Sequence, residues 1–174
     1  GVNEKSLLVD KSKPTTHITA PVNASSLPAF PATVSGTATD SWPSLSGSGI
    51  LENSTAAIRV AYYAENYAGC GGENLYWNIV SGAFDIPAGG YATDGVPPAA
   101  WGAPTTFNGT NWTVTASSVP ASGILKAGCR YHIYVKTFDK VGQETNFPAA
   151  AAAGTQHIYF PKTAPVPETV LTTP

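Results

Sequence analysis

The chain has 174 residues, enough for one substantial β domain or two small ones. Only 11% of its residues are charged, against a usual share of about 25%, and the formal net charge is -2. These values exclude a strongly basic surface for nucleic acid or an anionic membrane, and no apolar run approaches the ~20 residues that span a bilayer. We therefore expect no nucleic-acid partner and no membrane span.

Apolar and polar residues alternate with a period of two along much of the chain, which is typical of strands with one buried face. The clearest example is 129–139, where Tyr131, Ile133 and Val135 oppose more polar neighbours. Gly- and Pro-rich turns separate such segments, so we predict an all-β antiparallel sandwich of about seven strands. The expected strands, in chain order, are 16–20, 32–39, 57–63, 75–79, 111–116, 129–139 and 156–160.

The two cysteines, Cys70 and Cys129, each lie beside glycine, and neither belongs to a CxxC pair or has a histidine at ligand spacing. A zinc site is therefore not expected. We predict a disulfide, which would stabilise the fold by roughly 4 kcal/mol on the chain-entropy model and would place the protein outside the reducing cytosol. The alternative is two unpaired cysteines that act as small hydrophobic residues.

The order of short motifs along the chain is a second indication of the fold, beside the alternation of apolar and polar residues. GTATDSWPSLSGSGI (36–50) is followed by IRVAYY, LYWN and NWTVTA, and then by LKAGCRYHIYVKTFDKVGQE (125–144). This series resembles the immunoglobulin-like and fibronectin-III-like repeats of bacterial surface and secreted proteins. The resemblance implies an immunoglobulin-like sandwich over 10–160, with long inserted loops, in a protein that is secreted or held at the cell surface.

The resemblance also implies roles for individual residues. Leu125 and Tyr131 would form a tyrosine corner, in which the tyrosine hydroxyl bonds to the backbone near the preceding turn. Gly128 would supply a backbone conformation that most residues avoid. Trp77 and Trp112 each fall inside an alternating strand, and we interpret them as core aromatics rather than ligand-binding residues.

Two segments, 64–74 and 81–109, are longer than such repeats need. Loops longer than about 15 residues are uncommon unless they bind something or pack onto their own domain. We therefore name the aromatic residues of these segments as candidate contacts: Tyr67, Phe84, Tyr91 and Trp101. The alternative is that the two segments form a cover over one face of a sheet.

The two ends of the chain carry similar sequences, PTTHITAP at 14–21 and PETVLTTP at 167–174. If these are equivalent strands, the chain is one period of a tandem array. Residues 1–9 would then be the last strand or tail of a preceding repeat, and 161–174 the linker and start of the next. In an alternative arrangement, these terminal segments are donor and exchanged strands that join identical subunits into a fibre.

The sequence offers no catalytic constellation. None of the three histidines, His17, His132 and His157, has a nucleophile and an acid at a recognisable spacing, and we expect His132 on the solvated face of its strand. Residues Asp40, Glu52 and Asp139 lie near strand ends without the spacing of a calcium loop. We expect no enzymatic activity, no cofactor and no metal site.

The function that follows is a non-catalytic structural module whose partners are copies of itself or neighbouring repeats. The alternative is an adhesin or carbohydrate-binding module that uses the loops 64–74 and 81–109 to bind a glycan or a host or matrix protein. A third possibility is an accessory domain of a secreted enzyme.

Overall fold

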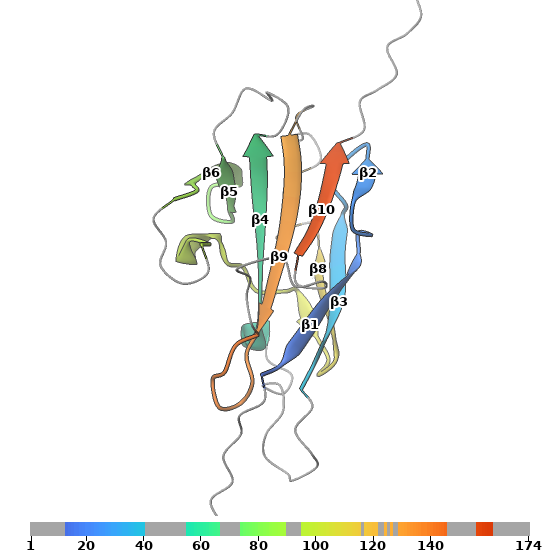
Figure 1. Cartoon of the computed structure of the whole chain (residues 1–174), viewed down its shortest axis with the longest axis vertical. Helices are drawn as coiled ribbons and strands as arrows, with labels where there is room; N and C mark the ends of the chain where they lie inside the picture. Colours follow the sequence, from blue (N-terminus) through green and yellow to red (C-terminus); the bar gives the residue numbers. More distant parts are fainter. Residues whose placement is uncertain are drawn as a thin grey trace, which may run out of the picture.

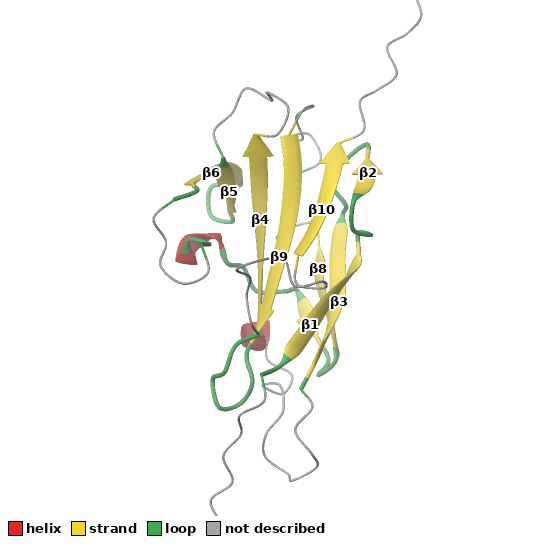
Figure 2. Ribbon diagram, in the orientation of Figure 1, coloured by secondary structure: helices red, strands yellow, loops and turns green. Residues whose placement is uncertain are grey.

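The structure is a computed structural model that describes residues 13–40, 55–66, 74–89, 95–115, 117–121, 124, 126, 129–145 and, for its backbone only, 156–161. These residues form ten β-strands and two single-turn 3-10 helices, η1 (Thr55–Ala57) and η2 (Pro98–Ala100), and no α-helix occurs among them. Figures 1 and 2 show the strands arranged in two layers.

The four-stranded sheet has the order β1-β3-β8-β7, and every pair in it is antiparallel. Its strands are β1 (Thr15–Ala20), β3 (Thr33–Thr39), β8 (Asn111–Thr115) and β7 (Thr106–Phe107). The six-stranded sheet has the order β2-β10-β9-β4-β5-β6. Its strands are β2 (Ser25–Leu27), β10 (Gln156–Pro161), β9 (Cys129–Thr137), β4 (Ile58–Asn66), β5 (Leu75–Asn78) and β6 (Ala83–Pro87).

The first two described strands, β1 and β2, belong to different sheets. After β1 the chain passes through a cis peptide bond between Ala20 and Pro21, and β2 then pairs in parallel with the end of β10 in the other sheet. All other ladders are antiparallel. Two such sheets packed face to face form a β-sandwich, so the predicted all-β sandwich is confirmed.

The core lies between the inward faces of the two sheets. Residues alternate between buried and exposed along β1, β3 and β8, because side chains of a strand point to opposite faces. The four-stranded sheet contributes Val34, Trp112 and Val114, and the six-stranded sheet contributes Ile58 and Ile133. Trp112 is completely buried, and Trp77 is 6% exposed and belongs to the same cluster.

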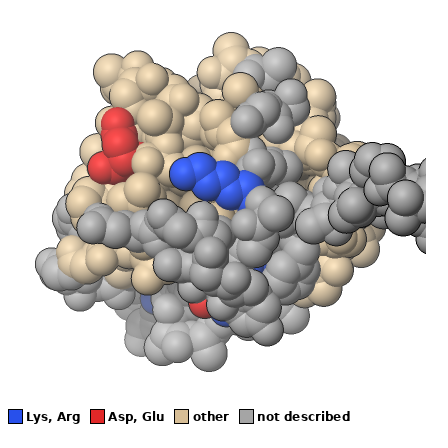
Figure 3. Space-filling model, turned by 90° about the horizontal axis from the view of Figure 1, so that it is seen from above, with Lys and Arg blue, Asp and Glu red and all other residues tan. Residues whose placement is uncertain are grey.

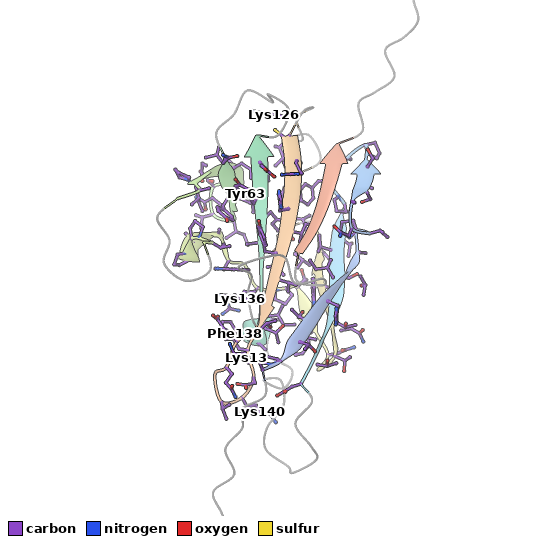
Figure 4. All side chains as sticks on the ribbon, in the orientation of Figure 1. Lys13, Tyr63, Lys126, Lys136, Phe138 and Lys140 are labelled. Carbon is purple, nitrogen blue, oxygen red and sulfur yellow. The ribbon has the colours of Figure 1, made fainter. Side chains whose placement is uncertain are left out.

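The chain enters and leaves the described sandwich at opposite ends of its long axis. Lys13, just before β1, lies at the lower end (Figure 4), and β10 ends at the upper end (Figure 1). Seen from above, most of the described surface at this upper end is neither acidic nor basic (Figure 3). The strands β1 and β10 therefore point in the same direction.

The segment 81–109 contains regular secondary structure, although the sequence predicts a long loop there. It includes β6, η2 and β7, and Gly102 forms a pair of backbone hydrogen bonds with Val60 of β4, at 2.8 and 2.9 Å. The Gly and Pro residues of this segment predicted a loop, but they only separate short pieces that pair with the two sheets.

Gly36 in β3 lies beneath the Trp112 indole of the neighbouring strand. A Cβ atom at this position would overlap the Trp112 ring and the backbone oxygen of His17 in β1. The indole Nε1 also donates a hydrogen bond to the carbonyl oxygen of Thr37, at 3.3 Å. The missing side chain at Gly36 therefore makes room for the largest residue of the core.

Replacing Gly36 with alanine should lower the free energy of unfolding by about 3 kcal/mol, because the added methyl group overlaps rigid neighbours. Gly102→Ala is the matched control, because a methyl group there meets the Cδ1 of Ile79, a mobile side-chain end, at 3.3 Å. Chemical denaturation measures both effects. Equal midpoints for the two variants would contradict the close packing described for Trp112.

Candidate functional site

The outer face of the six-stranded sheet carries most of the charged side chains found in described strands. In the β4–β9 ladder, Tyr63 lies opposite His132 and Glu65 lies opposite Arg130. These positions face away from the core, because Tyr62 and Ala64, which alternate with them along β4, belong to the core cluster. The candidate site is this group of polar and aromatic side chains on β4, β5 and β9.

Glu65 is the centre of the polar network. Its two carboxylate oxygens accept hydrogen bonds from Nε and Nη2 of Arg130, each at 2.5 Å. Its Oε2 also lies 2.6 Å from Nε2 of His132. The His132 side chain is only 8% exposed, whereas those of Glu65 and Arg130 are 26% and 27% exposed. The network therefore joins β4 and β9 with charged hydrogen bonds at a partly buried position.

The expectation that His132 is solvated is wrong. The ring stacks on Tyr134 with centroids 5.9 Å apart and lies 5.4 Å from the ring of Tyr63. Strand alternation correctly places His132 on the face opposite the core, but these tyrosines cover that face. The groups around the imidazole are tyrosines, an arginine and a glutamate from β4 and β9, and their contacts hold these two strands together.

Burial and charge shift the pKa values of this network. Hydrogen bonding from Arg130 is the main reason that the pKa of Glu65 lies below its ordinary value. Burial lowers the pKa of His132, and this effect outweighs the opposing effect of Glu65. Burial also raises the pKa of the Tyr134 and Tyr63 hydroxyls. Near neutral pH the network therefore consists of a charged Glu65–Arg130 pair and a neutral imidazole.

A covering segment, residues 95–102, packs onto the outer face beside this network. Val96 and Ala100 form a buried cluster with Ala61 of β4 and Tyr76 of β5, and the Tyr76 hydroxyl donates a hydrogen bond to the carbonyl oxygen of Gly95 at 3.0 Å. For these described residues, the interpretation of the long segment as a cover over one sheet face is confirmed.

The four candidate contact residues do not form one described surface. Phe84 is partly buried and packs on the core, 5.4 Å from Trp77 and 5.6 Å from Tyr131 between ring centroids. Trp101 is partly exposed in the covering segment, where the Lys136 ammonium group lies 4.6 Å from its ring centroid. The positions of Tyr67 and Tyr91 lie outside the described residues.

Tyr131 makes the hydrogen bonds of a tyrosine corner. Its hydroxyl accepts a hydrogen bond from the backbone N–H of Lys126 at 2.9 Å and donates to the carbonyl oxygen of Ile124 at 3.5 Å. The ring is 2% exposed, so the strand β9 is tied to the turn before it. The other two predicted members of this feature, Leu125 and Gly128, lie outside the described residues.

Cys129 begins β9 and is 5% exposed. It is not a free thiol. Its predicted partner, Cys70, lies outside the described residues, so the pairing of the two stays a prediction.

Asp139 closes the turn after β9. Its Oδ1 accepts hydrogen bonds from the backbone N–H groups of Val141 and Gln143, at 3.0 and 2.7 Å, and the residue is 1% exposed. In the described part of the chain, no group of three or more His, Cys, Asp or Glu residues could hold a metal ion. Glu52 lies outside that part. Asp139 therefore has a structural role as the cap of a turn.

Comparisons with known proteins give no relative. No family model matches the chain, and neither a curated protein nor a solved structure matches it. Within the described ranges, no helix has the length and hydropathy to cross a bilayer.

Tyr131→Phe should lower the free energy of unfolding by about 1.5 kcal/mol, because the backbone N–H of Lys126 loses its hydrogen-bond acceptor. Tyr62→Phe is the matched control. The Tyr62 hydroxyl is equally buried but has no hydrogen-bond partner in the part of the chain that the structure describes, so its removal should be neutral or stabilising. Denaturant titration separates the two, and an unchanged Tyr131→Phe midpoint would remove the corner as a stabilising feature.

Acid should destabilise the fold through His132. Its folded pKa is lowered, so its stabilising contribution is complete above the ordinary value of 6.5 and is lost as the pH falls below it. The lowered pKa of Glu65 acts in the same direction at lower pH, because its contribution is complete above 4.5 and is lost as the pH falls through the lowered pKa.

We expect His132→Gln to flatten the fall of the unfolding midpoint between about pH 7 and about pH 5. His17→Gln, which replaces an exposed histidine of the other sheet, should leave that fall unchanged. Thermal unfolding across this range is the measurement. The same pH dependence in wild type and His132→Gln would show that the network does not titrate as described.

Proposed function

We propose that this chain is a non-catalytic structural module of an extracellular or cell-surface assembly, an immunoglobulin-like repeat of the kind found in bacterial surface and secreted proteins. The observation that carries the proposal is the path of the chain, which enters the described sandwich beside Lys13 and reaches the opposite end with β10 (Figures 1 and 4). When such modules are joined end to end, each one adds the full length of its sandwich to the assembly.

The same path suits a module that bears tension. Strand β1 is held by its ladder to β3, and β10 by its ladder to β9. Because β1 and β10 point the same way, a pull from the two ends slides each strand along its neighbour. The hydrogen bonds of each ladder then share the load, whereas a sideways pull would break them one after another.

Two ways of joining copies fit this proposal. In a tandem array the next module follows covalently, as the similar sequences at 14–21 and 167–174 suggest. In a fibre, a terminal strand of one chain pairs with an edge strand of another. The described sheets end in the edge strands β1, β7, β2 and β6, and unpaired edges recruit strands.

Little in the described residues favours the alternative of an adhesin that uses its long loops. That function needs several aromatic rings exposed together as a stacking surface. Phe84 packs on the core, and Trp101 packs on the sheet beneath Lys136. We therefore retain the structural module as the proposed function.

Single-molecule stretching tests the proposal. A chain held at its two ends should unfold at a higher force than one held at its N-terminal end and at Lys140, at equal loading rate. Lys140 lies at the same end of the sandwich as Lys13 (Figure 4), so the second geometry peels strands apart. Equal forces in the two geometries would contradict a load-bearing role.

The extracellular location is tested separately, with a labelled antibody against the chain on intact cells that produce it. Staining before permeabilisation is the expected result. Staining only after permeabilisation would place the protein inside the cell and overturn the proposal.

A further inference from the structure

The outer face of the four-stranded sheet is an uncharged surface of hydroxyl groups. None of its strands contains Asp, Glu, Lys or Arg, whereas β4, β6 and β9 of the other sheet all do. Apart from His17 and Asn111, every outward position carries a hydroxyl. We call these nine residues the hydroxyl face: Thr15, Thr19, Thr33, Ser35, Thr37, Thr39, Thr106, Thr113 and Thr115.

The hydroxyl face is regular in two directions. Across the strands, Thr15 is opposite Thr39, and Ser35 is opposite Thr113, which is in turn opposite Thr106. Neighbouring strands lie about 4.8 Å apart, and outward residues recur about every 6.8 Å along each strand. The side chains therefore form a small lattice rather than a random polar surface.

Hydrogen bonds between side chains fix several positions of this lattice. The hydroxyl oxygens of Thr15 and Thr39 lie 3.0 Å apart, and those of Thr19 and Ser35 lie 3.4 Å apart. At the other side, the hydroxyl of Thr115 lies 3.1 Å from that of Thr105. Threonine is also stiff at χ1 because it is branched at Cβ, so the face is preorganised.

Other hydroxyls of the hydroxyl face have no such partner. The hydroxyls of Thr37, Thr106 and Thr113 make no hydrogen bond with any other part of the chain that the structure describes. Thr106 is exposed, and Thr37 and Thr113 are partly exposed. Each hydroxyl both donates and accepts hydrogen bonds. Thr106 lies directly opposite Thr113, and Thr37 lies diagonally across from Thr113 on β3, so these groups are available to a ligand.

The chemistry of the face restricts its partner. It has no cation for a phosphate or an acidic protein, and it lacks the aromatic, methionine and arginine residues that are enriched in protein interfaces. A neutral ligand with its own regularly spaced hydroxyls is complementary to it, because both sides donate and accept. An ordered lattice also loses little entropy on binding a partner that is itself ordered.

We propose that the hydroxyl face binds a solid, neutral, β-linked polysaccharide, of which cellulose and chitin are the two chemical types to test. The contact of one module is small, and repetition of the face along an assembly would strengthen it by avidity. This adhesive role goes beyond the proposed structural function, which does not depend on it.

The experiment is depletion of the whole chain from solution by microcrystalline cellulose and by chitin powder. The test variant carries Thr37→Val, Thr106→Val and Thr113→Val, which removes these three hydroxyls but keeps the shape and strand propensity of each residue. The matched control carries serine at the same three positions and so keeps the hydroxyls. Denaturant midpoints establish that both variants are folded.

We expect wild type and the serine variant to adsorb to at least one of the two solids, and the valine variant to partition about tenfold less. Three outcomes would overturn the proposal. They are a wild-type chain that stays in solution with both solids, a valine variant that adsorbs as well as wild type, and adsorption that is lost in Trp101→Ala instead. A failed stretching experiment with successful adsorption would reject the structural function alone.

Discussion

The position of the Trp112 indole over Gly36 is the constraint on which the sandwich depends. The ring comes from β8 and packs over Gly36 of β3, where a Cβ atom would overlap both the indole and the carbonyl oxygen of His17 in β1, so the absence of a side chain at Gly36 lets these three strands come together. Its Nε1 is satisfied by the carbonyl oxygen of Thr37, which allows a polar atom in a buried position. The opposite sheet supplies Ile58, Ile133 and Val135 to the same core.

Alternation in the sequence was sufficient to predict seven of the ten strands, and the physical reason is visible in their burial. Strands such as β3 and β8 have one face in the core and one in solvent. Their sequences therefore alternate between residues that face the core and polar residues that face solvent. The missed strands, β2, β6 and β7, have three, five and two residues. Two or three residues show too few alternations to be distinguished from a turn, and β6 has no fully buried position, so its five residues do not alternate between fully buried and exposed positions.

The environment of His132 was not predictable in the same way. A period of two assigns the residue to the face opposite the core, and that assignment was correct. What lies on that face depends on Tyr63 and Tyr134, and Tyr63 reaches His132 from β4, a strand far away in the sequence. The tyrosine corner was easier to predict, because the turn and Tyr131 are close together in the sequence. Contacts between distant segments leave no periodic trace in one sequence.

The covering segment affects which backbone amides are exposed to solvent by local fluctuations. It gives part of the six-stranded sheet a second apolar layer, so Ala61 of β4 is buried on the outer side as Ile58 and Tyr62 are on the inner side. Fluctuations that expose a backbone amide to solvent are rarest where both faces are covered. Strands β4 and β9, paired along nine residues each, would thus be the last to exchange their amide hydrogens with heavy water, while the short edge strands opened and closed around them.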